Sequence, residues 1–117
     1  DNHFASDMKM ESLQIMINEF KEIYPDALVE LEADEISQVI QFLRLKHIDV
    51  IMLDNMSKEQ ISEAIQLSNS TVLFEASGGI NLETVMGIAE TGVDRISVGA
   101  LTHSANAIDL ALDFQQQ

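Results

Sequence analysis

Hydrophobic residues recur along this chain at two different spacings, one typical of helices and the other typical of strands. Between residues 7 and 24 they come three or four positions apart, which predicts a helix with one buried face. That face consists of Leu13, Met16, Ile17, Phe20, Ile23 and Tyr24. Pro25 then predicts the end of the helix, and the short apolar segment at 27–32, which becomes alternating, predicts a strand.

The two spacings alternate along the rest of the chain. Further strands are predicted at residues 49–53, 71–75 and 95–99. Further helices are predicted from a cap at Asp34 to Leu45, after a capping box of Ser57 and Gln60, from Asn81 to Gly92, and at about residues 105–114. Their predicted buried positions are Ile36, Val39, Ile40, Leu43, Ile61, Ala64, Ile65, Leu82, Val85, Met86 and Ala89.

Strict alternation of helices with apolar strands is typical of a parallel sheet that is covered by helices. We therefore expect an α/β protein with parallel strands. A partial (β/α) barrel of the TIM-like type and a flavodoxin-like open sheet both fit this pattern. No GxGxxG sequence follows a predicted strand, which disfavours a dinucleotide-binding Rossmann domain.

The predicted strands end in polar residues or glycine, and in parallel α/β folds ligands bind at these carboxyl ends. The candidate site residues are His3, Glu30, Asp54, Asn55, Glu75, Ser77, Gly78, Gly79, Gly99, Ala100 and His103. Ser77, Gly78 and Gly79 precede a predicted helix, where free backbone N–H groups attract an anion. With the N–H groups of Gly99 and Ala100, they predict a phosphate cradle.

Two of these residues are carboxylates that suit a hard cation. Glu30 and Asp54 are expected on neighbouring strands, where Mg²⁺ would bind them together with a phosphorylated substrate. Alternatively, Glu30 is a solvent-facing residue of a half-buried strand, and the acidic residues that follow it are a solvated loop. His3 and His103 lack the HxH or HExxH spacing of a zinc site, so each is interpreted as a hydrogen-bond donor or a loop cap.

Charge and composition exclude several classes of partner and of chemistry. The 117 residues carry 20 Asp and Glu against 6 Lys and Arg, a net charge of −14, which argues against nucleic acid and anionic membranes as partners. No apolar run approaches the roughly 20 residues of a membrane span. The first residues lack a signal-peptide pattern, and without cysteine there is no disulfide or thiolate chemistry. We expect a cytoplasmic protein.

Several stretches resemble one enzyme family. They are "DNH" at 1–3, "IMLDNMS" at 51–57, "EASGGIN" at 75–81, "AETGVDRISVGALTHS" at 89–104 and "LDF" at 112–114. In this colinear order they look like the C-terminal half of quinolinate phosphoribosyltransferase, also called nicotinate-nucleotide pyrophosphorylase (carboxylating), of NAD biosynthesis.

The resemblance implies a reaction and roles for residues. The family transfers phosphoribosyl from PRPP to quinolinate with Mg²⁺, releasing pyrophosphate and CO₂ and forming nicotinate mononucleotide. Glu30 and Asp54 match carboxylates that contact the ribose hydroxyls and the metal. The phosphate cradle is matched by Ser77, Gly78 and Gly99, and Glu75 and His103 match positions near the same pocket. The resemblance also implies that the full-length protein is a dimer, in which the N-terminal domain of the neighbouring subunit completes the site.

The resemblance also implies what to expect of residues 1–117 as a unit. They correspond to the C-terminal part of the barrel domain, without the N-terminal sandwich domain and the first barrel strands. The basic residues that hold quinolinate in the family lie upstream, so we expect this segment alone to be inactive. The alternatives are a non-catalytic phosphate-binding half-barrel module, a molybdenum-transport-associated paralogue, which "EASGGI" and "GALTHS" disfavour, and a purely structural fragment.

Overall fold

The computed structural model describes residues 2–68, 71–101 and 107–113. In chain order the elements are α1 (Asn2–Ile23), β1 (Glu30–Ala33), α2 (Ile36–Phe42), β2 (Val50–Asp54), α3 (Lys58–Leu67), β3 (Leu73–Ser77), α4 (Val85–Ala89), β4 (Arg95–Leu101) and β5 (Ala107–Asp113). The sequence predicted the four parallel strands and the first four helices, with ends that differ by a few residues. None of the helices in the described residues is both long and apolar enough to cross a membrane.

The strands form one sheet in the order β1-β2-β3-β4-β5. The first four are parallel, as the alternation predicted, and successive strands are neighbours, as in a section of a (β/α) barrel. In the described residues β1 and β5 are the two edges, so the sheet is open rather than closed. The structure is therefore α/β, in the form of a partial barrel.

The predicted final helix at about 105–114 is wrong, because residues Ala107–Asp113 form β5. This strand runs antiparallel to β4, with Leu101 opposite Ala107 and Arg95 opposite Asp113. The segment reads "AIDLALD", in which branched apolar residues occupy every second position. That period of two suits a strand, and pairing along seven residues of β4 decides between the two readings.

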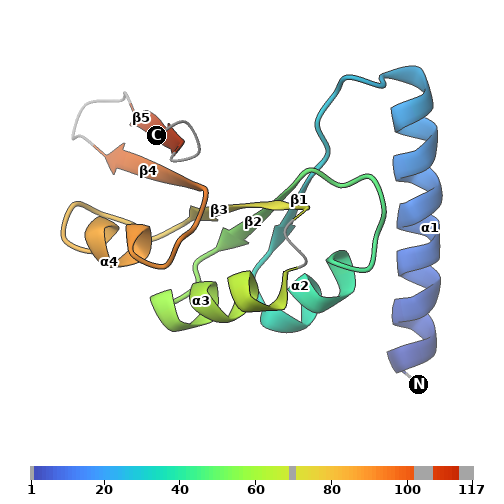
Figure 1. Cartoon of the computed structure of the whole chain (residues 1–117), viewed down its shortest axis with the longest axis horizontal. Helices are drawn as coiled ribbons and strands as arrows, with labels where there is room; N and C mark the ends of the chain where they lie inside the picture. Colours follow the sequence, from blue (N-terminus) through green and yellow to red (C-terminus); the bar gives the residue numbers. More distant parts are fainter. Residues whose placement is uncertain (1, 69–70, 102–106, 114–117) are drawn as a thin grey trace.

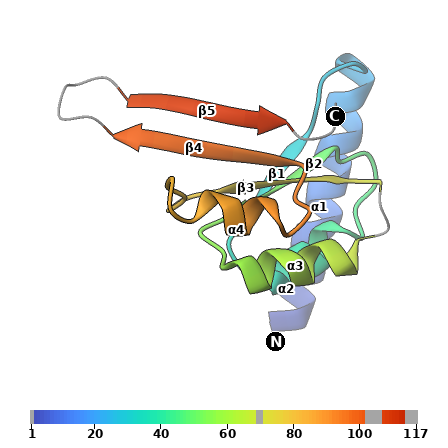
Figure 2. The ribbon, with the colours of Figure 1, turned by 60° about the vertical axis from the view of Figure 1, so that its left-hand side comes forward.

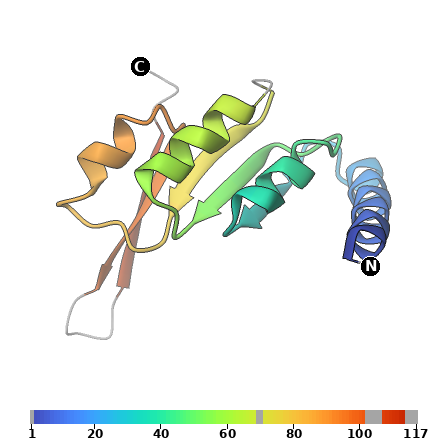
Figure 3. The same cartoon turned by 90° about the horizontal axis from the view of Figure 1, so that it is seen from below.

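Three helices cover one face of the sheet. Figure 2 shows α2, α3 and α4 on the same side of the strands, and Figure 3 shows α1 standing beyond the β1 edge. The core lies between the sheet and these three helices. Its buried members include Ala33, Val39, Ile51, Leu53, Ile61, Ala64, Phe74, Ala76, Ile88, Val93 and Ile96. Burial of this apolar surface is the main stabilising term for the fold.

Several predicted buried positions on α1, α2 and around α4 are exposed. Among the α1 side chains that the structure describes, Ile17 alone is buried, while Met16 and Ile23, and Tyr24 just after the helix, are more than half exposed, because this helix lies beside the sheet edge (Figure 1). On the other side of the molecule, Leu82 precedes the short helix α4 and is 86% exposed. Phe20, Ile40 and Met86 were also predicted to be buried, but the structure exposes them.

Candidate functional site

The face of the sheet opposite α2, α3 and α4 carries the polar residues of the strands. We call it the helix-free face; its polar members are Glu30, Glu32, Asp54, Glu75, Ser77, Arg95 and Ser97. Side chains of adjacent strands at one register level point to the same face. One level contains Glu32 opposite Met52, Met52 opposite Glu75, and Glu75 opposite Arg95. The next contains Asp54 opposite Ser77.

Glu75 is the most buried charged group on this face. Its side chain is only 9% exposed, and its Oε2 accepts a hydrogen bond of 2.8 Å from Ser97 Oγ. Hydrogen bonding offsets the cost of removing a carboxylate from water. Arg95 lies on the neighbouring strand at the same level and adds a positive charge to this otherwise acidic face.

The register separates the two carboxylates that were predicted to share a metal ion. Glu30 lies opposite Val50 at the start of β2, whereas Asp54 is the last residue of that strand. Four residue levels correspond to about 13 Å along parallel strands. The register therefore gives no support to a joint Mg²⁺ site of Glu30 and Asp54. Among the described residues no group of three or more Asp, Glu or His side chains is arranged to hold a metal ion.

Glu30 nevertheless responds electrostatically to the same face. Burial raises the pKa of its carboxyl above the ordinary value of 4.5, and the negative charges of Glu75 and Glu32 act in the same direction. The positive charge of Arg95 partly opposes them. The three other charged side chains of this face thus act on the carboxyl of Glu30.

At the carboxyl ends of β2 and β3 the two following loops meet. The backbone N–H of Asn55 donates a hydrogen bond of 2.8 Å to the carbonyl oxygen of Ser77. Gly78 has a positive φ of 79°, and a Cβ placed on it would lie 2.5 Å from Asp54 Oδ1 and 3.0 Å from the Asn55 nitrogen. Only glycine allows the backbone of the second loop to lie this close to Asp54.

Gly79 makes the same kind of approach to the other loop. Its φ is 68°, and an added Cβ would lie 3.0 Å from Asn55 Oδ1. Asn55 itself has a left-handed φ of 60°. Beside these residues lies a hollow of about 440 Å³, which Ser57, Lys58 and Thr84 also line. The structure thus brings together Asp54, Asn55, Ser77, Gly78 and Gly79, as the sequence predicted.

The anion cradle differs from the prediction in one respect. We expected a helix directly after Gly79, but α4 begins at Val85. The side chain of Asn81 accepts hydrogen bonds from the N–H groups of Glu83 and Thr84 at 2.8 and 3.0 Å, so these groups are already paired. Any anion bound here would rest on loop N–H groups rather than on the end of a helix.

The remaining predicted site residues fall elsewhere or outside the described part of the chain. Gly99 and Ala100 do not begin a loop; they lie within β4, opposite Asp109 and Ile108. His3 belongs to the first turn of α1, and its side chain lies outside the described part. His103 lies outside the described residues altogether. A ligand role for these four residues stays a prediction.

Sequence reasoning overlooked three residues of the helix-free face, namely Glu32, Arg95 and Ser97. The available signal was their alternation: "ELE", "FEAS" and "RIS" each place polar residues at every second position of a strand. Glu32 was assigned to a solvated loop. Its level is two residues nearer to Asp54 than that of Glu30, so it is the β1 carboxylate closer to the loop junction.

Comparison with known proteins agrees with this geometry. Residues 1–113 match the family described as the C-terminal domain of quinolinate phosphoribosyl transferase. The chain belongs to this family. It is 36% identical over 116 residues to a nicotinate-nucleotide pyrophosphorylase [carboxylating] of Mycobacterium leprae, with 97% of this chain and 39% of that protein covered.

Solved structures of the quinolinate phosphoribosyltransferase family share the fold. NadC from Streptococcus pyogenes is 33% identical, with a TM-score of 0.67 and coverage of 97% of this chain and 41% of that one. The nicotinate-nucleotide pyrophosphorylase from Francisella tularensis is 33% identical, with a TM-score of 0.66 and coverage of 82% and 35%. The chain therefore spans about two fifths, or less, of the length of these relatives.

Proposed function

We propose that this chain forms the phosphoribosyl side of a quinolinate phosphoribosyltransferase, which transfers phosphoribosyl from PRPP to quinolinate in NAD biosynthesis. The products are nicotinate mononucleotide, pyrophosphate and CO₂. The observation that carries the proposal is the loop junction of Asp54 and Asn55 with Gly78 and Gly79, at the carboxyl ends of β2 and β3 in a chain of this family. Relatives named for this activity support it.

The helix-free face supplies what such a reaction needs from this part of the protein. When the bond from ribose C1 to pyrophosphate breaks, positive charge develops on the sugar, and fixed carboxylates stabilise it. Asp54 belongs to the junction, Glu32 and Glu75 both lie two residue levels before it, and Glu75 accepts a hydrogen bond from Ser97. The loop N–H groups at Gly78 and Gly79 would fix a phosphate and thus orient the sugar.

The arrangement offers Mg²⁺ one protein carboxylate, that of Asp54. Mg²⁺ in phosphate sites commonly takes one or two protein carboxylates and completes its shell with phosphate oxygens and water. Asp54 suits the part of a single protein ligand, whereas Glu30 lies four levels away. When bound, the ion would neutralise the charge of the leaving pyrophosphate. The loop at Gly78 packs against Asp54 and would position its carboxylate for this role.

We also propose that quinolinate is held mainly by groups outside these 117 residues, in a cytoplasmic homodimer of the complete enzyme. The chain has only six Lys and Arg residues, and on the helix-free face only Arg95 is among them in the described residues. A substrate with two carboxylates is recognised best by several cations. Residues 1–117 are then the C-terminal part of the barrel domain.

Calorimetry with the isolated chain tests the proposal. PRPP should bind in the presence of Mg²⁺, and Asp54→Asn should weaken that binding about tenfold or more because a charge-assisted contact is lost. Nicotinate mononucleotide should not form from PRPP and quinolinate. Metal-independent phosphate binding that Asp54→Asn leaves unchanged would instead favour the non-catalytic phosphate-binding module.

A further inference from the structure

We propose a second binding site, for a phosphate-bearing small molecule, in the hollow between α1 and the loop from Arg44 to His47. This loop leads into the amino end of β2, so the hollow lies at the end of the sheet opposite Asp54 and Gly78. Its volume is about 570 Å³, within the range of small-molecule pockets. The site does not depend on the proposed function.

The first observation is a local reversal of charge. The chain carries −14 overall, yet Lys21, Arg44 and Lys46, three of its six Lys and Arg residues, line this one hollow together with His47. Glu22 is the single acidic residue among the lining residues. A concave site lined by one sign of charge concentrates ligands of the opposite sign.

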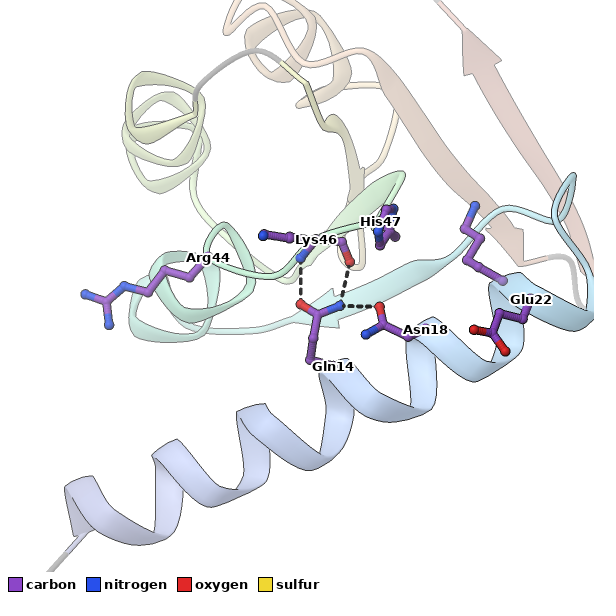
Figure 4. Close-up of a pocket in the computed structure, with 7 residues that line it drawn as sticks. Gln14, Asn18, Glu22, Arg44, Lys46 and His47 are labelled. Carbon is purple, nitrogen blue, oxygen red and sulfur yellow. Dashed lines mark hydrogen bonds between the residues drawn. The ribbon is translucent and has the colours of Figure 1, made fainter.

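The second observation is that two of these cations have no counterion among the described residues. Lys21 is paired, with its Nζ 2.9 Å from Asp49 Oδ2. Arg44 and Lys46 are exposed and make no such pair there. Their charges are therefore available to a ligand. Figure 4 shows that the two side chains extend in different directions from the same loop, so each would contact a different part of a ligand. Guanidinium and ammonium groups are both side-chain donors that bind phosphate oxygens.

The third observation is that the walls of the hollow are fixed before any ligand arrives. Figure 4 shows Gln14, Asn18 and Glu22 along one face of α1, with Lys46 and His47 on the facing loop. The Gln14 side chain clamps this loop at both backbone groups of Lys46. Its Oε1 accepts from the Lys46 N–H at 2.7 Å, and its Nε2 donates to the Lys46 carbonyl at 2.9 Å.

The neighbouring groups extend this preorganisation. Gln14 Nε2 also donates to Asn18 Oδ1 at 3.0 Å, which leaves the Asn18 NH₂ group to donate to a ligand. His47 has a left-handed φ of 69°. Of the described residues other than glycine, only Asn55, at the candidate active site, shares a positive φ. Such backbone conformations are uncommon and concentrate at functional sites.

Asp49 does not line the hollow, but it holds Lys21, which does. Burial raises the pKa of its carboxyl, but hydrogen bonds from Lys21 and the Val29 N–H, and the nearby charges of Lys21 and His47, outweigh this effect, so its pKa lies below 3.8. The bond from Val29 N–H is 2.7 Å, and Lys21 also donates to the Ala27 carbonyl at 2.7 Å. These contacts hold the Lys21 side chain in place and neutralise its charge, so Arg44 and Lys46 provide the charges for binding.

A titration followed by amide NMR tests the site on the 117-residue chain. The probe is inorganic pyrophosphate at constant ionic strength without metal. We expect saturable shifts of the Lys46 and His47 amides and of the Gln14 side-chain NH₂. Arg44→Gln/Lys46→Gln should raise the dissociation constant about tenfold or more, because two charge-assisted contacts are lost. Both side chains are exposed, so thermal melting should be unchanged.

The matched control is Lys9→Gln, set against Lys46→Gln alone; it removes one charge of the same kind from outside the hollow and should leave the dissociation constant within about twofold. Equal weakening by Lys9→Gln and Lys46→Gln, or an absence of saturable shifts, would overturn the proposal. Equal or tighter binding of citrate would overturn the assignment to phosphate. Shifts at Gly78 and Gly79 report on the proposed active site instead, so failure at one site is distinguishable from failure at the other.

Discussion

The two faces of the sheet show how one set of strands serves two purposes. On the helix-covered face, Ile51 and Leu53 are completely buried against apolar side chains. On the helix-free face, Asp54 follows Leu53 directly, and Glu75 lies buried between apolar neighbours in the sequence. Successive residues of a strand point to opposite faces, so stability and chemistry are assigned to alternate positions. A substitution should therefore act very differently on adjacent residues.

The largest expected difference is between Ile51 and Met52. Ile51→Ala should lower the free energy of unfolding by about 3 kcal/mol, because it leaves a cavity in the core. Met52→Ala on the helix-free face should cost about 1 kcal/mol, because Met52 is only partly buried. Denaturant unfolding measures both values. Equal losses would show that the two faces are packed alike.

The next comparison concerns two glycines that both have a positive φ. Gly78→Ala should cost about 2–3 kcal/mol, because it combines backbone strain with contacts on Asp54 and Asn55. Gly92 has a φ of 91°, but a Cβ added there would meet no atom within 4 Å. Gly92→Ala should therefore cost about 1 kcal/mol, from backbone strain alone. Thermal or denaturant unfolding of the two variants isolates the contact. If the two lose the same stability, the loop junction is not tight.

A smaller effect is expected inside the helix-free face. Ser97→Ala removes the hydrogen bond to buried Glu75 and should cost about 1.5 kcal/mol, measured by denaturant unfolding at neutral pH. Ser62→Ala on α3, which loses no hydrogen bond to a buried carboxylate, should change stability by less than about 0.5 kcal/mol. If Ser97→Ala leaves the free energy of unfolding unchanged, the hydrogen bond from Ser97 does not stabilise buried Glu75.

The smallest effect is a pH dependence that arises at Glu30. Because folding raises its pKa above 4.5, the group stabilises the fold most when protonated, and that contribution is lost as pH rises through its folded pKa. Glu30→Gln should therefore be more stable than the natural chain at pH 7, by a few tenths of a kcal/mol since the side chain is exposed. The difference should vanish near pH 3. A constant difference between pH 3 and 7 would contradict the shift.

Local signals in the sequence predicted most of the elements. The Ser57–Gln60 capping box is present as expected, with Gln60 N–H donating to Ser57 Oγ at 3.1 Å. The glycines after β3 do lie at the end of the sheet beside Asp54. These signals depend on short-range sterics and hydrogen bonding, which a few adjacent residues determine.

Features that depend on distant partners were predicted less well. The apolar stripe of α1 indicated a buried face, but of its six predicted members only Ile17 is buried, because the helix lies at the sheet edge. The last segment became a strand because it pairs with β4. Glu30 was matched to the family's strand carboxylate and Glu32 was assigned to a solvated loop, since nothing local gives the register of β1 on β2.

The sequence by itself determined the alternation of helices with strands, the family, and the positions of the carboxylates and glycines along the chain. The tertiary structure decided which of them meet. It placed Glu32, rather than Glu30, nearer to Asp54, aligned Ser97 with Glu75, and set Gln14 against Lys46 across 32 residues. The physical reason is that periodicity and capping act within a few residues. Register and helix placement follow from hydrogen bonding and burial between segments far apart in the chain.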